Sequence, residues 1–268
     1  MTSPARDWGA ENWADVLPSV LGFKRPPIDL YVVARHRRIR RLSFRFIIPR
    51  GMMVPVEGGF EVYLRDQAQK ELDISKPETM QDLSFRQRFS LAHEIAHTRF
   101  YRFSDSVPSA DAMTPTWRSL EDNCDRMAGC ILIPTNLLKQ KIRDYGKEID
   151  GGFVRSVASD FRTSVTVALE RLRVVEAASS FDRCILLAQR VQGDAEIRSL
   201  FFGLGLSPVL PRPEKYTRIT DWLPNFPRCA LSQLTDSGSF AARTGRTITF
   251  TTTDLGNSGR FLLELQAA

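Results

Sequence analysis

The 268-residue chain contains little histidine and little cysteine. It has three histidines and four cysteines, and no two cysteines form a Cys-x-x-Cys pair. The cysteine positions show no spacing typical of a disulfide framework, so we expect them to be reduced. This excludes disulfide-rich secreted scaffolds and zinc sites built on paired cysteines.

Long apolar runs, internal repeats and low-complexity tracts are also missing. No apolar run approaches about 18 residues, the length that a membrane-spanning helix requires. Residues 1–12 lack the basic and then apolar pattern of a signal peptide. We therefore expect a cytoplasmic protein with no membrane partner. A composition of 43% hydrophobic and 25% charged residues is typical of one large globular domain or two smaller ones.

Two of the three histidines fall in one pentad, His93-Glu94-Ile95-Ala96-His97. On a helix, residues four apart share a face, so both imidazoles can reach one Zn²⁺ ion. Glu94 follows the first ligand directly and stands where a general base for an activated water is needed. The alternative is a pair of surface histidines that hydrogen-bond on a helix. The pattern favours a zinc peptidase site with one Zn²⁺ per chain.

The residues around the pentad favour a helix. Ser84 and Gln87 have the spacing of a capping box, which predicts that the helix starts there. No proline or glycine interrupts the chain from Ser84 to Phe103. An apolar stripe at helical spacing is expected to pack on the core; its members are Phe85, Phe89, Ala92 and Ala96.

A third zinc ligand must come from another segment. His36 lies in a run of arginines that would repel a cation. Other acidic candidates are Asp105, Asp111, Glu121, Asp122 and Asp125. We select Glu121, on a helix packed against the first one, because this is the gluzincin arrangement. We expect Asp125 to accept the free N–H of a ligand histidine. In the alternative, both carboxylates face solvent.

The second helix is framed by Thr114-Pro115, an N-cap followed by proline, and by Pro134, which stops it. One face is apolar by spacing; its members are Leu120, Cys124, Met127, Ala128 and Ile131. Cys124 is interpreted as a packed core residue, with a zinc-blocking thiolate as the alternative. Tyr101, one turn after His97, is interpreted as a packed helix residue, with contact to a tetrahedral intermediate as the alternative.

Two segments resemble the ImmA/IrrE family of zinc metallopeptidases. Arg86 to His97 is close to R-x-R-F-T-x-A-H-E-x-G-H, and Glu121 to Pro134 is similar to E-x-E-A-N-x-F-A-x-x-L-L-M-P. In the second motif the chain departs from the family at Asn123, Cys124, Asp125 and Met127. The resemblance implies a zinc endopeptidase that cleaves, or antagonises, one helix-turn-helix repressor in the bacterial cytoplasm. The settings it implies are DNA damage, induced mobile elements and phage defence.

An arginine-rich stretch lies between residues 35 and 50. Arginines interleaved with aromatic rings suit a phosphate-bearing strand, so we consider stimulation by single-stranded DNA. The alternative is a strand edge kept soluble by its charge. The candidate contacts are Arg35, Arg37, Arg38, Arg40, Arg41 and Arg45.

We predict an α+β fold in which residues 1–150 form the zinc peptidase domain. A helix is expected at residues 13–23, with strands at 28–33, 42–48 and 60–64. The strand Phe60 to Leu64 is the candidate edge strand that holds the substrate backbone.

Residues 151–176 resemble a helix-turn-helix unit, and they are basic enough for groove binding, although in this family such a segment more often packs on the peptidase domain. Residues 177–268 are predicted to form a smaller, mostly β domain that serves as a sensor, similar to GAF, or as a docking domain. Strands are expected there at 184–188, 197–202, 247–252 and 261–265.

A site-specific repressor protease is the preferred function. The rival is a non-cleaving anti-repressor or DNA-binding regulator, which has no need for the carboxylate of Glu94. A broad degradative protease is disfavoured, because an unregulated peptidase in the cytoplasm would be harmful.

Overall fold

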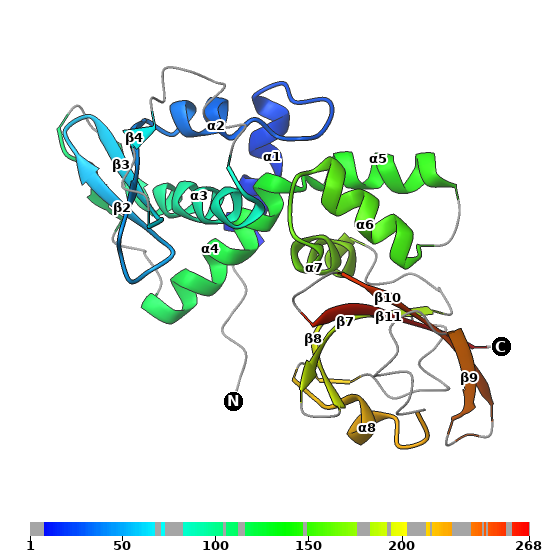
Figure 1. The fold of residues 1–268 in the computed structure, drawn as a ribbon. Coiled ribbons are helices and arrows are strands. Elements are labelled where there is room, and N and C mark those ends of the chain that lie inside the picture. Colours follow the sequence, from blue (N-terminus) through cyan, green and yellow to red (C-terminus); the bar gives the residue numbers. More distant parts are fainter. Residues whose placement is uncertain are drawn as a thin grey trace. The chain divides into compact units, whose positions relative to one another are not determined.

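The computed structural model is an α+β protein in which the chain divides into two compact units (Figure 1). One unit comprises Met1–Leu137 with Asp160–Ser164, and the other comprises Leu138–Ser159 with Val165–Ala268. No described helix is both long and apolar enough to cross a bilayer. The structure describes residues 8–67, 71–72, 83–103, 106–111, 116–146, 149–175, 183–191, 194–202, 213–214, 216–226, 237–242, 244, 246–255 and 259–267.

A small mixed sheet and several helices form the first unit. The strand order is β2-β3-β1-β4, with β2 and β3 antiparallel and β1 parallel to β3. Helix α3 packs against β2, β3 and α4, and α4 packs against α1. The strands are β1 (Ile39–Arg45), β2 (Gly51–Val56), β3 (Gly59–Arg65) and β4 (Glu71–Leu72). The helices are α1 (Trp8–Val20), α2 (Leu30–His36), α3 (Phe85–His97), the short 3₁₀ helix η2 (Thr98–Phe100) and α4 (Trp117–Leu132).

The strand predicted at residues 28–33 is wrong, because the chain forms α2 there. Asp29 caps this helix by accepting a hydrogen bond from the backbone N–H of Tyr31 at 2.9 Å. Leu30, Val33 and Ala34 are buried at helical spacing. The cap and this spacing override the β-propensity of the branched residues.

The prediction of the edge strand is also wrong. Residues 60–64 do lie in a strand, β3, but β3 pairs with strands on both sides. One end of the sheet is β2, a strand that was not predicted because Gly51 and Pro55 are unfavourable in strands. The strand expected at 42–48 begins and ends earlier, as β1, and leaves Phe46 exposed.

The predicted apolar face of the second motif helix is confirmed. All five of its members are buried in α4. The stripe predicted for the first motif helix is partly wrong, since Phe85 is 47% exposed and the core side is formed by Leu91, Ala92, Ile95 and Ala96. Helix α3 ends at His97 and gives way to η2. The predicted N-cap at 114–115 lies outside the described residues.

The second unit contains a five-stranded antiparallel sheet of order β8-β7-β11-β10-β9. The four strands predicted in this region are confirmed as β7, β8, β10 and β11, and β9 was missed. The strands are β7 (Arg183–Val191), β8 (Asp194–Phe202), β9 (Ser237–Ala241), β10 (Thr247–Asp254) and β11 (Arg260–Ala267). The helices of this region are α5 (Thr135–Tyr145), α6 (Gly151–Asp160), α7 (Val165–Val175) and α8 (Ile219–Trp222).

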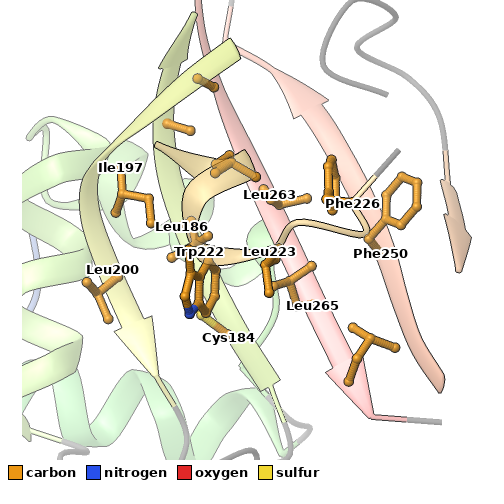
Figure 2. Close-up of a cluster of buried hydrophobic side chains, with 14 of the residues drawn as sticks. Cys184, Leu186, Ile197, Leu200, Trp222, Leu223, Phe226, Phe250, Leu263 and Leu265 are labelled. Atoms are coloured by element: carbon orange, nitrogen blue, oxygen red, sulfur yellow. The ribbon is translucent and has the colours of Figure 1, made fainter. Parts of the chain in front are cut away.

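Apolar side chains from the strands and from the α8 region form a buried cluster against this sheet. Figure 2 shows Trp222, Leu223 and Phe226, from α8 and the residues after it, against side chains of the strands. Helix α7 packs against β8, and Glu264 on β11 accepts a hydrogen bond from the N–H of Gly151 at the start of α6. The two helices of the predicted helix-turn-helix segment are therefore largely part of the unit that contains this sheet.

Candidate metal centre

Helix α3 starts at the predicted capping box. The Ser84 hydroxyl accepts from the N–H of Gln87, and the Gln87 side chain accepts from the N–H of Ser84. One turn later the buried guanidinium of Arg88 donates to the carbonyl oxygens of Ile28, at 2.9 Å, and Arg162, at 3.1 Å. These bonds fix the helix that carries the pentad to two distant segments of the chain.

The side chains of His93, His97 and Glu121 converge on one point. The two Nε2 atoms are 3.1 Å apart. One carboxylate oxygen of Glu121 lies 3.2 Å from Nε2 of His93, and the other lies 3.3 Å from Nε2 of His97. Helices α3 and α4 pack side by side, which brings the third candidate to the first two.

This group has the spacing that a metal requires. Ligand atoms at about 2.0–2.1 Å from a tetrahedral Zn²⁺ are separated by about 3.3 Å. The separation of the two Nε2 atoms and the distance from each of them to one carboxylate oxygen of Glu121 are close to that value, and one ligand atom from each residue lies within 4.8 Å of the other two. Two neutral imidazole nitrogens so close together would repel through their lone pairs, so the arrangement fits a cation held between them. Among the described residues, these three side chains form the group able to hold a metal ion.

Asp125 lies one turn after Glu121 on α4. Its carboxylate is 2.8 Å from Nδ1 of His93, which directs Nε2 of that ring toward the metal position. Burial lowers the pKa of His93, but the hydrogen bond and charge of Asp125, together with the charges of Glu94 and Glu121, outweigh this, and the net pKa is raised. For His97, burial and then the charge of His93 lower the pKa to about 4. His97 is therefore neutral at pH 7 and able to bind a metal.

Glu94 is 5% exposed and lies against the edge strand β2. Burial raises its pKa to about 7, while His93 and a hydrogen bond from the backbone of Met53 oppose the shift. A Cβ atom on Gly51 would lie 2.5 Å from Oε1 of Glu94. The carboxylate therefore occupies the space that the missing side chain of Gly51 leaves open.

The backbone of β2 presents alternate residues outward from the sheet. The N–H of Arg65 donates to the carbonyl of Arg50 at 3.0 Å, so this pair is hydrogen-bonded across the hairpin. The antiparallel pattern then directs the polar groups of Gly51, Met53 and Pro55 away from β3. The position of Pro55 agrees, because a proline has no N–H to lose there.

A pocket of about 560 Å³ opens over the ligand group. Its walls come from β2 on one side and from α3 and α4 on the other. The lining includes Gly51, Met52, Met53, His93, Glu94, His97, Tyr101, Glu121 and Asp125. An extended peptide laid along β2 would pass beside both the ligand group and Glu94.

Two candidates from the sequence have contrasting environments. The prediction that Tyr101 lies on the helix is wrong, because α3 ends at His97 and Tyr101 lies on the short strand β5 (Tyr101–Arg102), which pairs with β6 (Ser109–Ala110). Tyr101 lines the pocket, and its ring meets that of Phe60 edge to face, with centroids 5.3 Å apart. Cys124 is fully buried, and burial, followed by the charge of Glu121, raises the pKa of its thiol. A protonated core thiol is a poor zinc ligand, which favours the packing interpretation.

The structure does not bring the other ligand candidates to this group. His36 is exposed at the end of α2. Asp111 lies 3.3 Å from Arg102, in an ion pair. Asp105 lies outside the described residues.

The arginine stretch makes separate contacts within the fold. Arg37 donates to Thr98 through its Oγ1, at 2.9 Å, and its carbonyl, at 3.1 Å, and lies over the rings of Trp13 and Phe103. Burial, and then the charge of Arg99, lower the pKa of Arg37 to about 10. The other contacts are Arg35 with Tyr31, Arg38 with Phe103, Arg40 with the Gly58 carbonyl and Arg41 with Glu61. Arg45 is half-buried on β1.

Comparison with known proteins adds one finding. The family model described as the IrrE N-terminal-like domain, Peptidase_M78, matches residues 81–173. Over residues 81–173 the chain is therefore similar to the ImmA/IrrE metallopeptidases. This IrrE-like segment contains α3 and α4 and thus every member of the ligand group. None of the curated proteins matches the chain.

Proposed function

We propose that the chain is a zinc-dependent, site-specific endopeptidase that cleaves a helix-turn-helix transcriptional repressor in the cytoplasm. The observation that carries the proposal is the convergence of His93, His97 and Glu121 beside the buried carboxylate of Glu94. Two imidazoles and one carboxylate form the ligand set of gluzincin-type catalytic zinc sites, which leave one position open. The IrrE-like match supports a peptidase rather than a structural zinc site.

A bound zinc ion would supply Lewis-acid polarisation of the scissile carbonyl and lower the pKa of a water. Glu94 acts as the general base and then as the acid, since its carboxylate lies in the pocket with the ligands. A pKa of about 7 suits a group that accepts a proton and releases it to the leaving amine near neutral pH. The contacts of Gly51 and Met53 hold the carboxylate in position for both transfers.

The substrate backbone is proposed to lie along β2. The carbonyl groups of Gly51, Met53 and Pro55 point away from β3 and can pair with an added extended strand. Such pairing orients a peptide without reading its sequence. The site therefore also needs side-chain contacts to select one bond in one protein.

The family resemblance supports a repressor as the substrate and DNA damage, a mobile element or phage as the setting. Single-stranded DNA is proposed as a stimulator on the charge of the arginine stretch, although the candidate arginines also make contacts within the fold. A GAF-like sensor role for residues 177–268 draws support from the antiparallel sheet packed by α7.

A substrate trap tests the proposal against its non-cleaving rival. The Glu94→Gln chain, loaded with zinc, is used to capture partners from host lysate with and without DNA damage. We expect capture of a small helix-turn-helix protein that wild type cuts at one bond and Glu94→Gln leaves intact. The matched control is Glu170→Gln, which removes an exposed carboxylate that pairs with Arg173 on α7.

A non-cleaving anti-repressor predicts the opposite result. Capture of the same protein by zinc-loaded wild type, with no cut even when single-stranded DNA is added, would support an anti-repressor. Equal cleavage by wild type and by Glu94→Gln would refute the role of Glu94 as the base.

A further inference from the structure

A second pocket, of about 440 Å³, adjoins the metal pocket. Arg50 and Ser90 line both pockets, so the two spaces meet at the start of β2 and along α3. A chain that leaves the metal site past the beginning of β2 therefore enters this second space. Its residues come from three separate segments, so no local pattern in the sequence predicts this pocket.

The second pocket is cationic. Three exposed arginines line it, Arg50 before β2, Arg65 at the end of β3 and Arg86 in the first turn of α3. Asp66 is the acidic residue of the lining, and its carboxylate accepts a hydrogen bond from Gln87 at 2.9 Å. The lining thus carries two more positive than negative charges.

One of these arginines is held by the fold. The guanidinium of Arg65 donates to the carbonyl of Ile48 at 3.2 Å, which fixes the side chain near the β1–β2 connection. On the same connection Phe46 is 74% exposed and also lines the pocket. The space therefore offers cationic donors beside an exposed aromatic ring.

We propose that this pocket binds an acidic side chain of the substrate, within a few residues of the scissile bond. The inference rests on the proposed peptidase function and deepens it by naming a specificity determinant. Guanidinium groups bind carboxylates through paired hydrogen bonds. Phe46 contacts the apolar part of the same segment.

A peptide fits this pocket better than a nucleic acid does. A bound single strand requires a groove with cations repeated along the backbone. Here the positive charges form one compact group that opens onto the metal pocket. Two excess charges match one or two carboxylates.

Peptide binding by the full-length, zinc-loaded Glu94→Gln chain tests the inference without cleavage. The probes are two fluorescein-labelled octapeptides, one alternating alanine with glutamate and the other alanine with glutamine, measured by fluorescence anisotropy at low salt. We expect the glutamate peptide to bind about tenfold more tightly, through charge-assisted pairs. Arg65→Gln with Arg86→Gln should abolish that preference.

The matched control is Arg143→Gln with Arg155→Gln, which removes the same charge from exposed positions on α5 and α6 outside the pocket lining. This control should retain the tenfold preference, and circular dichroism should show that both double variants are folded. If both double variants lose the preference for the glutamate peptide to the same extent, the preference depends only on net charge. That result would overturn the assignment of this pocket as the binding site.

Three further results would overturn the inference. The first is equal binding of the two peptides, and the second is no binding of either peptide up to about 1 mM. The third is that a labelled dT oligonucleotide binds in a way that depends on Arg65 and Arg86, while the glutamate peptide does not bind. Failure of the peptidase function is visible separately, as a wild-type chain that binds no zinc or leaves the captured protein intact. A chain that cleaves but shows no charge preference refutes the acidic subsite alone.

Discussion

The α3–α4 pair and the arginine-rich strand β1 both concentrate residues able to do chemistry, yet they use them in opposite ways. On α3 and α4, side chains from residues 93 to 125 converge on one point in a pocket. On and before β1, the arginines contact several separate parts of the fold, among them Thr98, Gly58 and Glu61. Residue type alone did not distinguish these regions. The two regions differ in whether their side-chain atoms meet at one point. Where they meet, we infer a chemical role, and where they do not, we infer a role in the stability of the fold.

Among the substitutions that leave the three candidate ligands in place, we expect Gly51→Ala to have the largest effect on the candidate metal centre. In Gly51→Ala the new Cβ would meet Oε1 of Glu94 at 2.5 Å, so the carboxylate must move. A displacement near 1 Å costs about 100-fold in rate, and we expect kcat on the captured substrate to fall by about 10- to 100-fold.

In this variant the KM, zinc content and melting temperature should stay near wild type, because Gly51 belongs to none of the ligand contacts. Gly152→Ala, on the exposed face of α6, is the control for a glycine substitution as such. A fall in zinc content equal to the fall in kcat would show that Gly51 supports the whole site instead of Glu94.

Asp125→Asn changes the residue that orients the ligand His93. The amide keeps the shape but cannot hold the His93 ring as a carboxylate does, at 2.8 Å from Nδ1. Loss of such a partner costs about 10- to 100-fold in metal affinity. Competition with a chromogenic chelator measures this loss, and Asp122→Asn, outside the pocket lining, should bind zinc like wild type. Unchanged affinity in Asp125→Asn would refute the orienting role.

A pair of arginine variants tests whether the arginines on and before β1 stabilise the fold. Arg37→Met removes two hydrogen bonds to Thr98 and contacts with two rings, so we expect a loss of about 2 to 4 kcal/mol in the free energy of unfolding. Arg41→Met breaks an exposed pair with Glu61 at 4.0 Å and should change it by less than about 0.5 kcal/mol. Urea unfolding measures both. Equal small effects, with loss of DNA stimulation, would restore the nucleic-acid interpretation.

The converging site should also lower the stability of the metal-free protein. The pKa of Glu94 is about 7 in the fold and about 4.5 otherwise, so the fold prefers the neutral carboxyl. The free energy of unfolding therefore falls as pH rises from about 4.5 to 7, by about 3 kcal/mol. Glu94→Gln removes this cost.

We expect metal-free Glu94→Gln to be more stable than wild type by about 3 kcal/mol at pH 8, and by less than about 1 kcal/mol at pH 5. Urea unfolding with a chelator present gives both values. His97, whose lowered pKa does not depend on Glu94, is common to both proteins and cancels in the difference, whereas the raised pKa of His93 includes a contribution from the charge of Glu94. The same difference at both pH values would contradict the raised pKa.

Local patterns in the sequence predicted the two motif helices well. The capping box at Ser84 and the five buried positions of α4 follow from spacing and side-chain type alone. The choice of Glu121 over other acids followed from one helix packing on another, and the geometry of the ligand group agrees with it.

Features that depend on tertiary pairing could not be predicted in the same way. Strand β2 is stabilised by pairing with β3 and by its contact with α3, which overcome the unfavourable Gly51 and Pro55. The helix α2 depends on the cap at Asp29, whereas branched residues suggested a strand. The contact of Gly51 with Glu94 joins positions 43 residues apart, and no periodicity records it.

The equilibrium affinity for zinc in three proteins tests the metal centre most directly. Wild type, Glu94→Gln and Glu121→Gln are each titrated against a chromogenic chelator, with metal content checked by mass spectrometry. We predict one zinc per chain and similar affinity for wild type and Glu94→Gln, and an affinity lower by more than about 100-fold for Glu121→Gln, since loss of a ligand exceeds loss of its supporting partner. Wild-type affinity in Glu121→Gln, or loss of zinc in Glu94→Gln, would contradict the assignment of ligand and base.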